Sequence, residues 1–136
     1  MKNELSTAFS GDYHEIHTPM VTLNEYINKC RAKCYAANSI KQKIQAKIAM
    51  EITLMPMYLQ PIAIVFIWFE PNLRRDLDNI SFEKKFILDT MVKLRKIRND
   101  SPKYVRAFVD KFQYSKGNPR KVVMHIKKLG NEFAMY

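Results

Sequence analysis

The chain has little glycine and little cysteine, and each scarcity excludes a class of function. Three glycines in 136 residues leave neither a glycine-rich phosphate loop nor a flexible linker. The two cysteines, Cys30 and Cys34, cannot complete a zinc site or a disulfide framework by themselves. We therefore expect a protein of the reducing cytoplasm.

Long hydrophobic runs are also missing. The most apolar stretch, IAIVFIWF at residues 62–69, has eight residues, whereas a membrane-spanning helix needs about 20. The first ten residues lack an apolar stretch of the length found in signal peptides. These absences predict a soluble protein with no membrane partner. The hydrophobic content of 47% predicts a single folded domain over residues 1–136.

Positive charge is abundant and unevenly distributed. The net charge is +10; residues 1–70 carry seven Lys and Arg against six Asp and Glu, and residues 71–136 carry 16 against seven. An excess in one half is typical of a protein with a polyanionic partner, either nucleic acid or an acidic membrane surface. Because these basic residues fall within predicted helices and strands, we expect a shaped binding face. A merely solubilising surface is the alternative.

The hydrophobic pattern predicts a small α/β (α+β) domain. Capping-box spacing at residues 22–25 and again at 39–42 predicts two helix starts. We expect helices at about 23–37, from Ser39 to Pro56, and at 79–96, and strands at 15–17, 62–69, 104–114 and 120–128. The order β-α-α-β-α-β-β predicts a small mixed β-sheet with helices packed on it.

Asp76 and Asp78 form the leading site candidate. They follow the most apolar strand and precede the predicted helix at 79–96, a position that ligand sites in α/β folds favour. Asp78 has a structural explanation as the N-cap of that helix, but this leaves Asp76 as an unneeded negative charge. A divalent cation such as Mg²⁺ would account for both carboxylates.

Two further residues could join this site. Lys85 lies two helical turns after Asp78, so both project from one face and the lysine could reach a phosphate bound there. Its structural alternative is an ion pair with Asp89. Asp100 would complete a three-carboxylate cluster if the following strand pairs beside residues 62–69. A simple turn is the ordinary interpretation of Asp100.

The aromatic and histidine side chains give weaker signals. We expect the aromatic residues to lie in the core or an interface rather than to stack on bases. We expect the histidines to be solvated or hydrogen-bonded rather than metal ligands, with His125 on an exposed strand face. These two groups comprise Tyr26, Tyr35, Phe108, Tyr114, His14, His17 and His125.

The combined pattern resembles the RusA family of Holliday junction resolvases. It consists of Arg75-Asp76-Leu77-Asp78-Asn79, then Lys85 with Asp89 four residues later, then Asn99-Asp100. The segment 19–26, with its Leu-Asn-Glu-Tyr, is also similar to the N-terminal part of that family. The resemblance implies a RusA-like fold and a Mg²⁺-dependent endodeoxyribonuclease, with Mn²⁺ able to substitute. It also implies a homodimer that cuts branched DNA, the four-way junction, by paired nicks in recombination and repair, encoded by a bacterium or a phage.

The resemblance further implies the catalytic residues. Asp76, Asp78 and Asp100 would hold the metal, and Lys85 would stabilise charge on the phosphate. The chain between Asp78 and Lys85 is longer than in the best-known form of the motif, so Lys84 is an alternative for the essential lysine.

DNA contacts are expected from Arg74, Arg75, Lys84 and the basic C-terminal half, which makes binding salt-dependent. Two other functions stay open. One is a non-catalytic, basic nucleic-acid-binding module in which the aspartates only cap a helix. The other is a nuclease that acts on flaps or replication forks.

Overall fold

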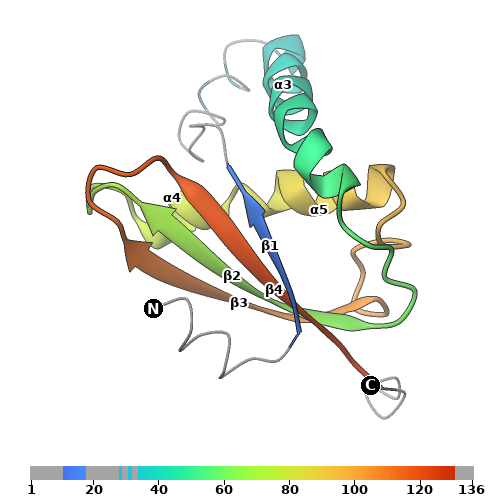
Figure 1. Ribbon diagram of the computed structural model, residues 1–136. Helices are drawn as coiled ribbons and strands as arrows, with labels where there is room; N and C mark the ends of the chain where they lie inside the picture. The colour runs from blue at the N-terminus through green and yellow to red at the C-terminus, as the bar shows by residue number, and fades with distance from the viewer. Residues whose placement is uncertain (1–10, 18–27, 29–30, 32–33, 131–136) are drawn as a thin grey trace.

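Four strands form one mixed sheet, and the helices lie on a single face of it (Figure 1). The computed structural model describes residues 11–17, 28, 31 and 34–130. In chain order the elements are β1 (Asp12–Ile16), α3 (Cys34–Thr53), β2 (Ile62–Glu70), α4 (Leu77–Ser81), α5 (Lys84–Lys93), β3 (Val105–Tyr114) and β4 (Lys121–Lys128). The predicted small mixed α+β fold is confirmed. The helix predicted at 23–37 lies mostly outside the described residues.

The central strand β2 organises the sheet, whose strand order is β1-β4-β2-β3. β4 pairs with β2 antiparallel and β3 pairs with it parallel, so that Ile64 lies opposite both Ile126 and Phe108. The strand after Asp100 does pair with residues 62–69, which is the condition stated above for Asp100 to approach the other aspartates. β3 is left as an edge strand, with its outer side unpaired within the described part of the chain.

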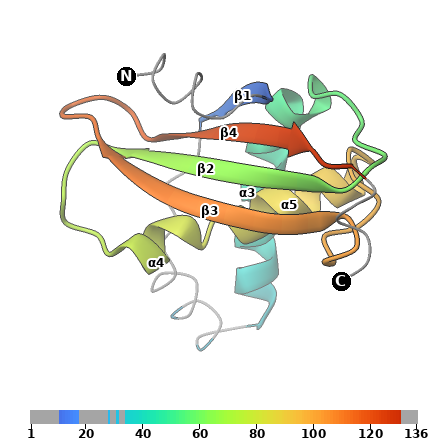
Figure 2. The same ribbon diagram turned by 90° about the horizontal axis from the view of Figure 1, so that it is seen from below.

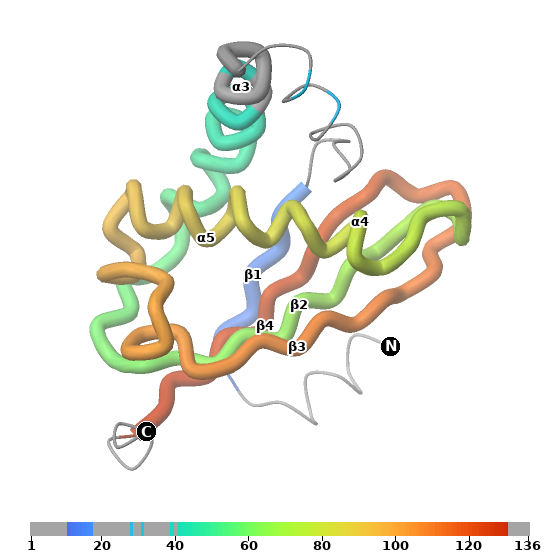
Figure 3. Tube along the Cα trace, turned by 180° about the vertical axis from the view of Figure 1, so that it is seen from behind, coloured from blue at the N-terminus to red at the C-terminus, as the bar shows by residue number. Residues whose placement is uncertain are grey.

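The hydrophobic core lies between the sheet and the two longer helices. In Figures 2 and 3, α3 and α5 lie on the same side of the strands, and α5 crosses them. Isoleucines spaced four apart on α3, among them Ile48 and Ile52, bring one face of that helix into the core. Ile87 and Met91 do the same for α5 and pack with Phe66 of β2.

Two helix boundaries differ from those that the sequence predicts. Ser39 lies inside α3, so the expected helix start at this position is wrong. The expected single helix at 79–96 is divided into α4 and α5, with a break at residues 82–83. The break coincides with Glu83, whose side chain is bound to Arg120 at the start of β4. A tertiary ion pair therefore accompanies the interruption of an otherwise helical pattern.

Glu70, Glu83 and Arg120 form a buried ion-pair network that joins β2, the α4–α5 junction and β4. Arg120 Nε donates a hydrogen bond to Glu70 at 2.6 Å, and Arg120 Nη1 donates one to Glu83 at 3.1 Å. The Arg75 guanidinium lies 4.0 Å from Glu70. The three residues of the network are at most 4% exposed. Because buried charges are stable only when they are paired, this network fixes the two ends of the segment that carries Asp76 and Asp78.

The chain reverses after α5 at Arg95, which adopts a left-handed conformation with φ of 60°. Lys96 N donates to Met91 O at 2.8 Å, and Arg95 N donates to Val92 O at 3.0 Å. This is the Schellman arrangement, in which glycine usually occupies the left-handed position. The helix end therefore closes without a glycine, at the expense of backbone strain in Arg95.

We expect Arg95→Gly to raise the free energy of unfolding by about 0.5–1 kcal/mol, because glycine relieves the left-handed strain. Chemical denaturation measures this change. Arg98→Gly is the matched control, since Arg95 is the one non-glycine residue with positive φ among those described, and this control should destabilise the protein. Destabilisation by both substitutions would contradict the strain at Arg95.

One histidine of the sheet, His125, is buried, and another, His14, is half-buried. His125 is 3% exposed and its ring packs edge-on against Tyr13, so the expectation of an exposed position is wrong. His14 shares a hydrogen bond of 2.9 Å with the Tyr58 hydroxyl, which also donates to Asp12 at 2.6 Å. Burial lowers the pKa of His14 and of His125. The same burial, together with the bond to Asp12, raises the pKa of Tyr58.

The lowered histidine pKa values predict acid sensitivity. As pH falls below about 6.5, the unfolded chain takes up protons before the folded protein does. The free energy of unfolding should therefore be at its full value above about pH 6.5 and decrease as the pH falls toward the folded-state pKa values. Denaturation at a series of pH values measures this slope. The slope should be smaller in His125→Asn, and an unchanged slope would contradict the prediction.

Candidate functional site

A groove with a volume of about 350 Å³ lies between the α4–α5 segment and the edge strand β3. Four residues that the sequence singles out come together here, although they belong to α4, to α5 and to the turn before β3. The complete lining is Asp78, Ser81, Phe82, Lys84, Lys85, Leu88, Asp100 and Phe108. The groove therefore combines carboxylates, ammonium groups and an aromatic wall.

The start of α4 places the two motif aspartates in different surroundings. Asp76, not Asp78, is the N-cap residue of this helix, and its side chain makes no capping hydrogen bond. Asp78 lies in the first helical turn, where its carboxylate accepts a hydrogen bond from Asn79 N at 3.1 Å. Asp78 lines the groove, whereas Asp76 does not. The predicted capping role for Asp78 is therefore wrong.

The two lysines at the start of α5 differ in whether their ammonium group already forms an ion pair within the protein. Lys84 Nζ lies 2.5 Å from the Asp110 carboxylate and 4.7 Å from the centroid of the Phe108 ring. Lys85 is exposed and makes no ion pair with any residue that the structure describes. The expected alternative partner of Lys85, Asp89, is instead paired with Lys41 of α3 at 3.0 Å. Lys85 is thus the lysine whose charge is available to a ligand in the groove.

Asp100 lies on a tight turn between α5 and β3. Asn99 Oδ1 accepts hydrogen bonds from Ser101 N at 2.9 Å and from Ser101 Oγ at 2.5 Å, so a turn is indeed formed. Asp100 itself is exposed, lines the groove and has no ion-pair partner within the described part of the chain. The turn explains Asn99 but assigns no structural role to the Asp100 carboxylate.

The three aspartates do not form a closed metal site. In residues 11–17, 28, 31 and 34–130, no three His, Cys, Asp or Glu side chains gather closely enough to hold a metal ion. Asp78 and Asp100 do line one groove, and Mg²⁺ in phosphate-processing sites usually takes one or two carboxylates and completes its shell with water and phosphate oxygens. The chemistry of this pair therefore suits Mg²⁺, while the predicted third ligand, Asp76, does not share the groove.

The arginines predicted to contact DNA lie on the loop that enters α4. Arg74 is exposed, and its backbone N donates to Asn72 Oδ1 at 3.0 Å, which shapes the loop. Arg75 is partly covered and lies near the buried Glu70. Arg74 is therefore the more accessible of the two for DNA, whereas Arg75 also interacts with Glu70 within the protein.

The sequence analysis did not predict the roles of two β3 residues near the groove. Phe108 is 44% exposed and lines the groove, although we expected it to be in the core or an interface. Asp110 holds Lys84 and also accepts a hydrogen bond from Trp68 Nε1 at 2.8 Å. Both lie on β3, and the edge position of this strand, which no local pattern reveals, brings Phe108 to the groove and Asp110 to Lys84.

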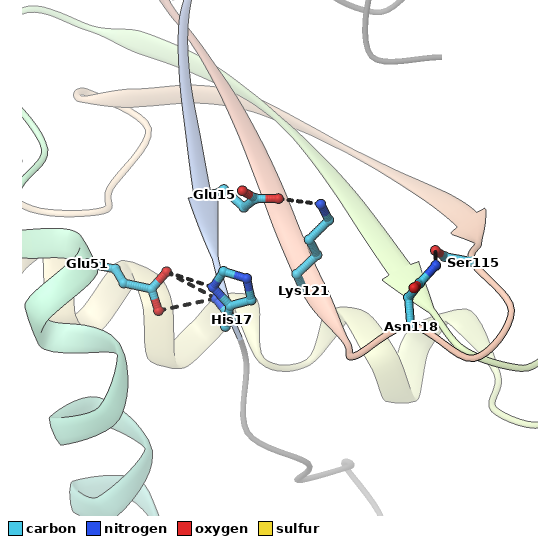
Figure 4. A network of polar contacts seen from close by, with 6 residues as sticks. All are labelled: Glu15, His17, Glu51, Ser115, Asn118 and Lys121. Carbon is cyan, nitrogen blue, oxygen red and sulfur yellow. Dashed lines mark hydrogen bonds and ion pairs between the residues drawn. The ribbon is translucent and has the colours of Figure 1, made fainter.

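A second polar cluster lies near the edge of the sheet opposite to β3, around the end of β1 (Figure 4). His17 contacts Glu51 of α3 at 3.2 Å, and Lys121 of β4 is paired with Glu15. Neighbouring Asn118 bonds to the side chain of Ser115. Because the carboxylates here are used to join β1 to α3 and β4, we assign this cluster a structural role.

Comparison of the sequence with models of known protein families and with curated proteins gives no match. The likeness to the RusA family therefore stays a resemblance, and the functional interpretation depends on the groove. Among the described residues, no helix has both the length and the apolar character needed to cross a membrane.

Proposed function

We propose that this protein is a Mg²⁺-dependent endodeoxyribonuclease that resolves four-way DNA junctions by paired nicks. One observation carries the proposal: Asp78, Lys84, Lys85 and Asp100, from three separate elements, line the same groove. Acidic and basic side chains in one groove suit a phosphodiester, since carboxylates can hold a metal and ammonium groups can neutralise the phosphate.

The residues of the groove would have different roles in the reaction. Asp78 and Asp100 would hold Mg²⁺ in the groove. A metal held there would supply Lewis-acid chemistry, polarising the scissile phosphate and lowering the pKa of an attacking water. Lys85 would offset the negative charge that develops on the phosphate in the transition state. Lys84, already paired with Asp110, would shape the groove next to Phe108.

Binding to DNA would be supported by charge outside the groove. Residues 71–136 carry 16 basic and seven acidic side chains, and the exposed Arg74 lies on the loop that leads to Asp76. Phosphate contacts of this kind release counterions, so the affinity should fall steeply with salt. A two-fold symmetric homodimer would match a junction whose equivalent strands are cut on opposite sides.

Asp78→Asn tests the metal-binding role. The substitution keeps the size of the side chain and an oxygen that can accept the bond from Asn79 N, but it removes the charge that the metal needs. We expect the nicking rate on a synthetic four-way junction with Mg²⁺ to fall by at least about 100-fold, with junction binding retained.

Asp89→Asn is the matched control, because Asp89 is an aspartate of α5 outside the groove. This variant should nick the junction at nearly the rate of the unsubstituted protein. An equal loss of activity in the two variants would indicate a general effect of the substitution and would contradict the assignment of Asp78.

A non-catalytic junction-binding module is the second candidate, and it is favoured because Asp76, Asp78 and Asp100 do not gather into a three-carboxylate cluster among the described residues. This alternative predicts tight, salt-dependent junction binding without nicks in either Mg²⁺ or Mn²⁺. A nuclease for flaps or forks would instead nick those substrates in preference to the four-way junction. The same labelled substrates, compared side by side, distinguish the three functions.

A further inference from the structure

A second hollow, with a volume of about 540 Å³, lies where α5 ends. One wall comes from the connection between α3 and β2, and the other comes from the chain that follows α5. The lining residues are Met57, Tyr58, Leu59, Val92, Arg95, Ile97 and Arg98. This set shares no residue with the groove of Asp78 and Asp100, so the hollow requires its own explanation.

The walls of the hollow are anchored to the core. Tyr58 N donates to Lys96 O at 2.7 Å, which joins the two wall segments directly. Lys96 Nζ also donates to Thr53 O at 3.0 Å. Tyr58 and Ile97 are both buried members of the hydrophobic core. The hollow is therefore preformed, and a ligand would not have to order its walls.

Large apolar side chains are exposed around this hollow. Leu59 is 73% exposed, and Met57 is exposed as well. Met50 and Leu54, near the end of α3, are also exposed. A group of exposed apolar side chains on a rigid frame is typical of an interaction site rather than of an ordinary protein surface.

Two guanidinium groups line the same hollow. Neither Arg95 nor Arg98 makes an ion pair with a described residue, and the lining contains no carboxylate. Arg95 also holds the left-handed backbone position at the end of α5, where glycine would be unstrained. A strained residue that lines a hollow suggests a role in binding, because such strain is frequently retained at ligand sites.

We propose that this hollow binds an acidic peptide segment of a partner protein that carries one large apolar side chain. The apolar side chain would contact Met57, Leu59 and Val92, among which methionine adapts readily to different shapes. Carboxylates beside it would bind Arg95 and Arg98, since arginine pairs with carboxylates through two parallel hydrogen bonds.

The composition of the lining favours a peptide over a nucleic acid. Phosphate backbones are bound mainly by basic and polar groups, whereas this lining contributes five apolar or aromatic side chains and two arginines. An acidic peptide uses both kinds of contact at the same time. The proposal is independent of the nuclease activity.

Fluorescence anisotropy with labelled peptides tests the proposal. The probe is a short fluorescein-labelled peptide in which one phenylalanine is flanked on each side by aspartate and glutamate. One control peptide has alanine in place of the phenylalanine, and another has amides in place of the carboxylates. We expect saturable binding of the probe and an affinity at least about tenfold lower for each control.

Protein variants locate the site. Arg95→Gly should weaken probe binding at least about tenfold without lowering the melting temperature, because glycine suits this backbone position. Arg98→Ala and Leu59→Ser should weaken it similarly. Lys116→Ala, which removes an exposed charge in the turn before β4, should leave binding unchanged.

Three outcomes would overturn the proposal. The first is the absence of saturable binding. The second is equal affinity for the phenylalanine and alanine peptides, which would indicate attraction by charge alone. The third is unchanged binding in both Arg95→Gly and Leu59→Ser. If duplex DNA binds and loses affinity in these same variants while the peptide does not bind, the surface belongs to the nucleic acid instead.

Discussion

Replacing Arg120 with methionine is expected to lower the free energy of unfolding by about 3–5 kcal/mol, because it leaves two buried carboxylates without their shared cation. Glu70 and Glu83 are both almost fully buried, and Arg120 donates to each of them. Methionine retains much of the aliphatic volume, so the loss reports on charge rather than on a cavity. Urea denaturation of the purified variant measures it.

Lys121→Met is the control for this prediction. Lys121 is the next residue and is paired with Glu15, but both side chains are about one-third exposed. Exposed ion pairs contribute about 0–1 kcal/mol, so this variant should be much less destabilised. Similar losses in the two variants would contradict the assigned role of the buried network.

A compensated variant separates charge from packing. Combining Arg120→Met with Glu70→Leu and Glu83→Leu removes the charges of all three members, and replacing a buried ion network by apolar residues is often neutral or stabilising. We therefore expect the triple variant to be more stable than Arg120→Met alone. Its nicking activity would then show whether the network is also needed to position the segment that carries Asp78.

Replacing Lys85 with methionine is expected to lower the nicking rate on a four-way junction by about 100- to 1,000-fold, the usual effect of removing a group that stabilises transition-state charge. Lys85 is exposed and unpaired among the described residues, so its removal should leave the melting temperature nearly unchanged. Single-turnover kinetics with saturating protein separate this loss from any change in DNA affinity.

Lys84→Met provides the comparison, because the same substitution one residue earlier acts on a different environment. Lys84 is about one-fifth exposed, is paired with Asp110 and lies over the Phe108 ring. We expect this variant to lose about 1–2 kcal/mol of stability and to retain more nicking activity than Lys85→Met. The reverse order of activities would assign the essential role to Lys84.

Local patterns predict the elements of this fold better than they predict where the elements end. The apolar run at 62–69 and the alternation before Lys128 predict the strands β2 and β4, although burial alternates along the first half of β2 and is continuous from Val122 to Ile126 of β4. The capping signal at Ser39 fails because it occurs inside α3, which begins at Cys34 and packs on the core further along, at Ile48 and Ile52. Packing over several turns outweighs a single cap.

The candidate site is also only partly predictable from the sequence. Asp78, Lys85 and Asp100 can be identified as candidates from their residue types and spacing, whereas the parallel pairing of β2 and β3 is seen only in the structure. The ion-pair partners of the neighbouring residues cannot be identified from the sequence, because the pairs Lys84–Asp110 and Asp89–Lys41 join residues that are distant in sequence. Residue type therefore identifies candidate residues, whereas the fold decides which of them are available to a ligand.

The most direct measurement is nicking of a synthetic four-way junction by the unsubstituted protein, with each strand end-labelled in turn. The proposed function predicts Mg²⁺-dependent nicks at symmetric positions in two opposing strands, none in the matched linear duplex, and none when EDTA replaces the metal. Tight binding of the junction by the folded protein with no nicks in either Mg²⁺ or Mn²⁺ would contradict the enzyme and leave a junction-binding module.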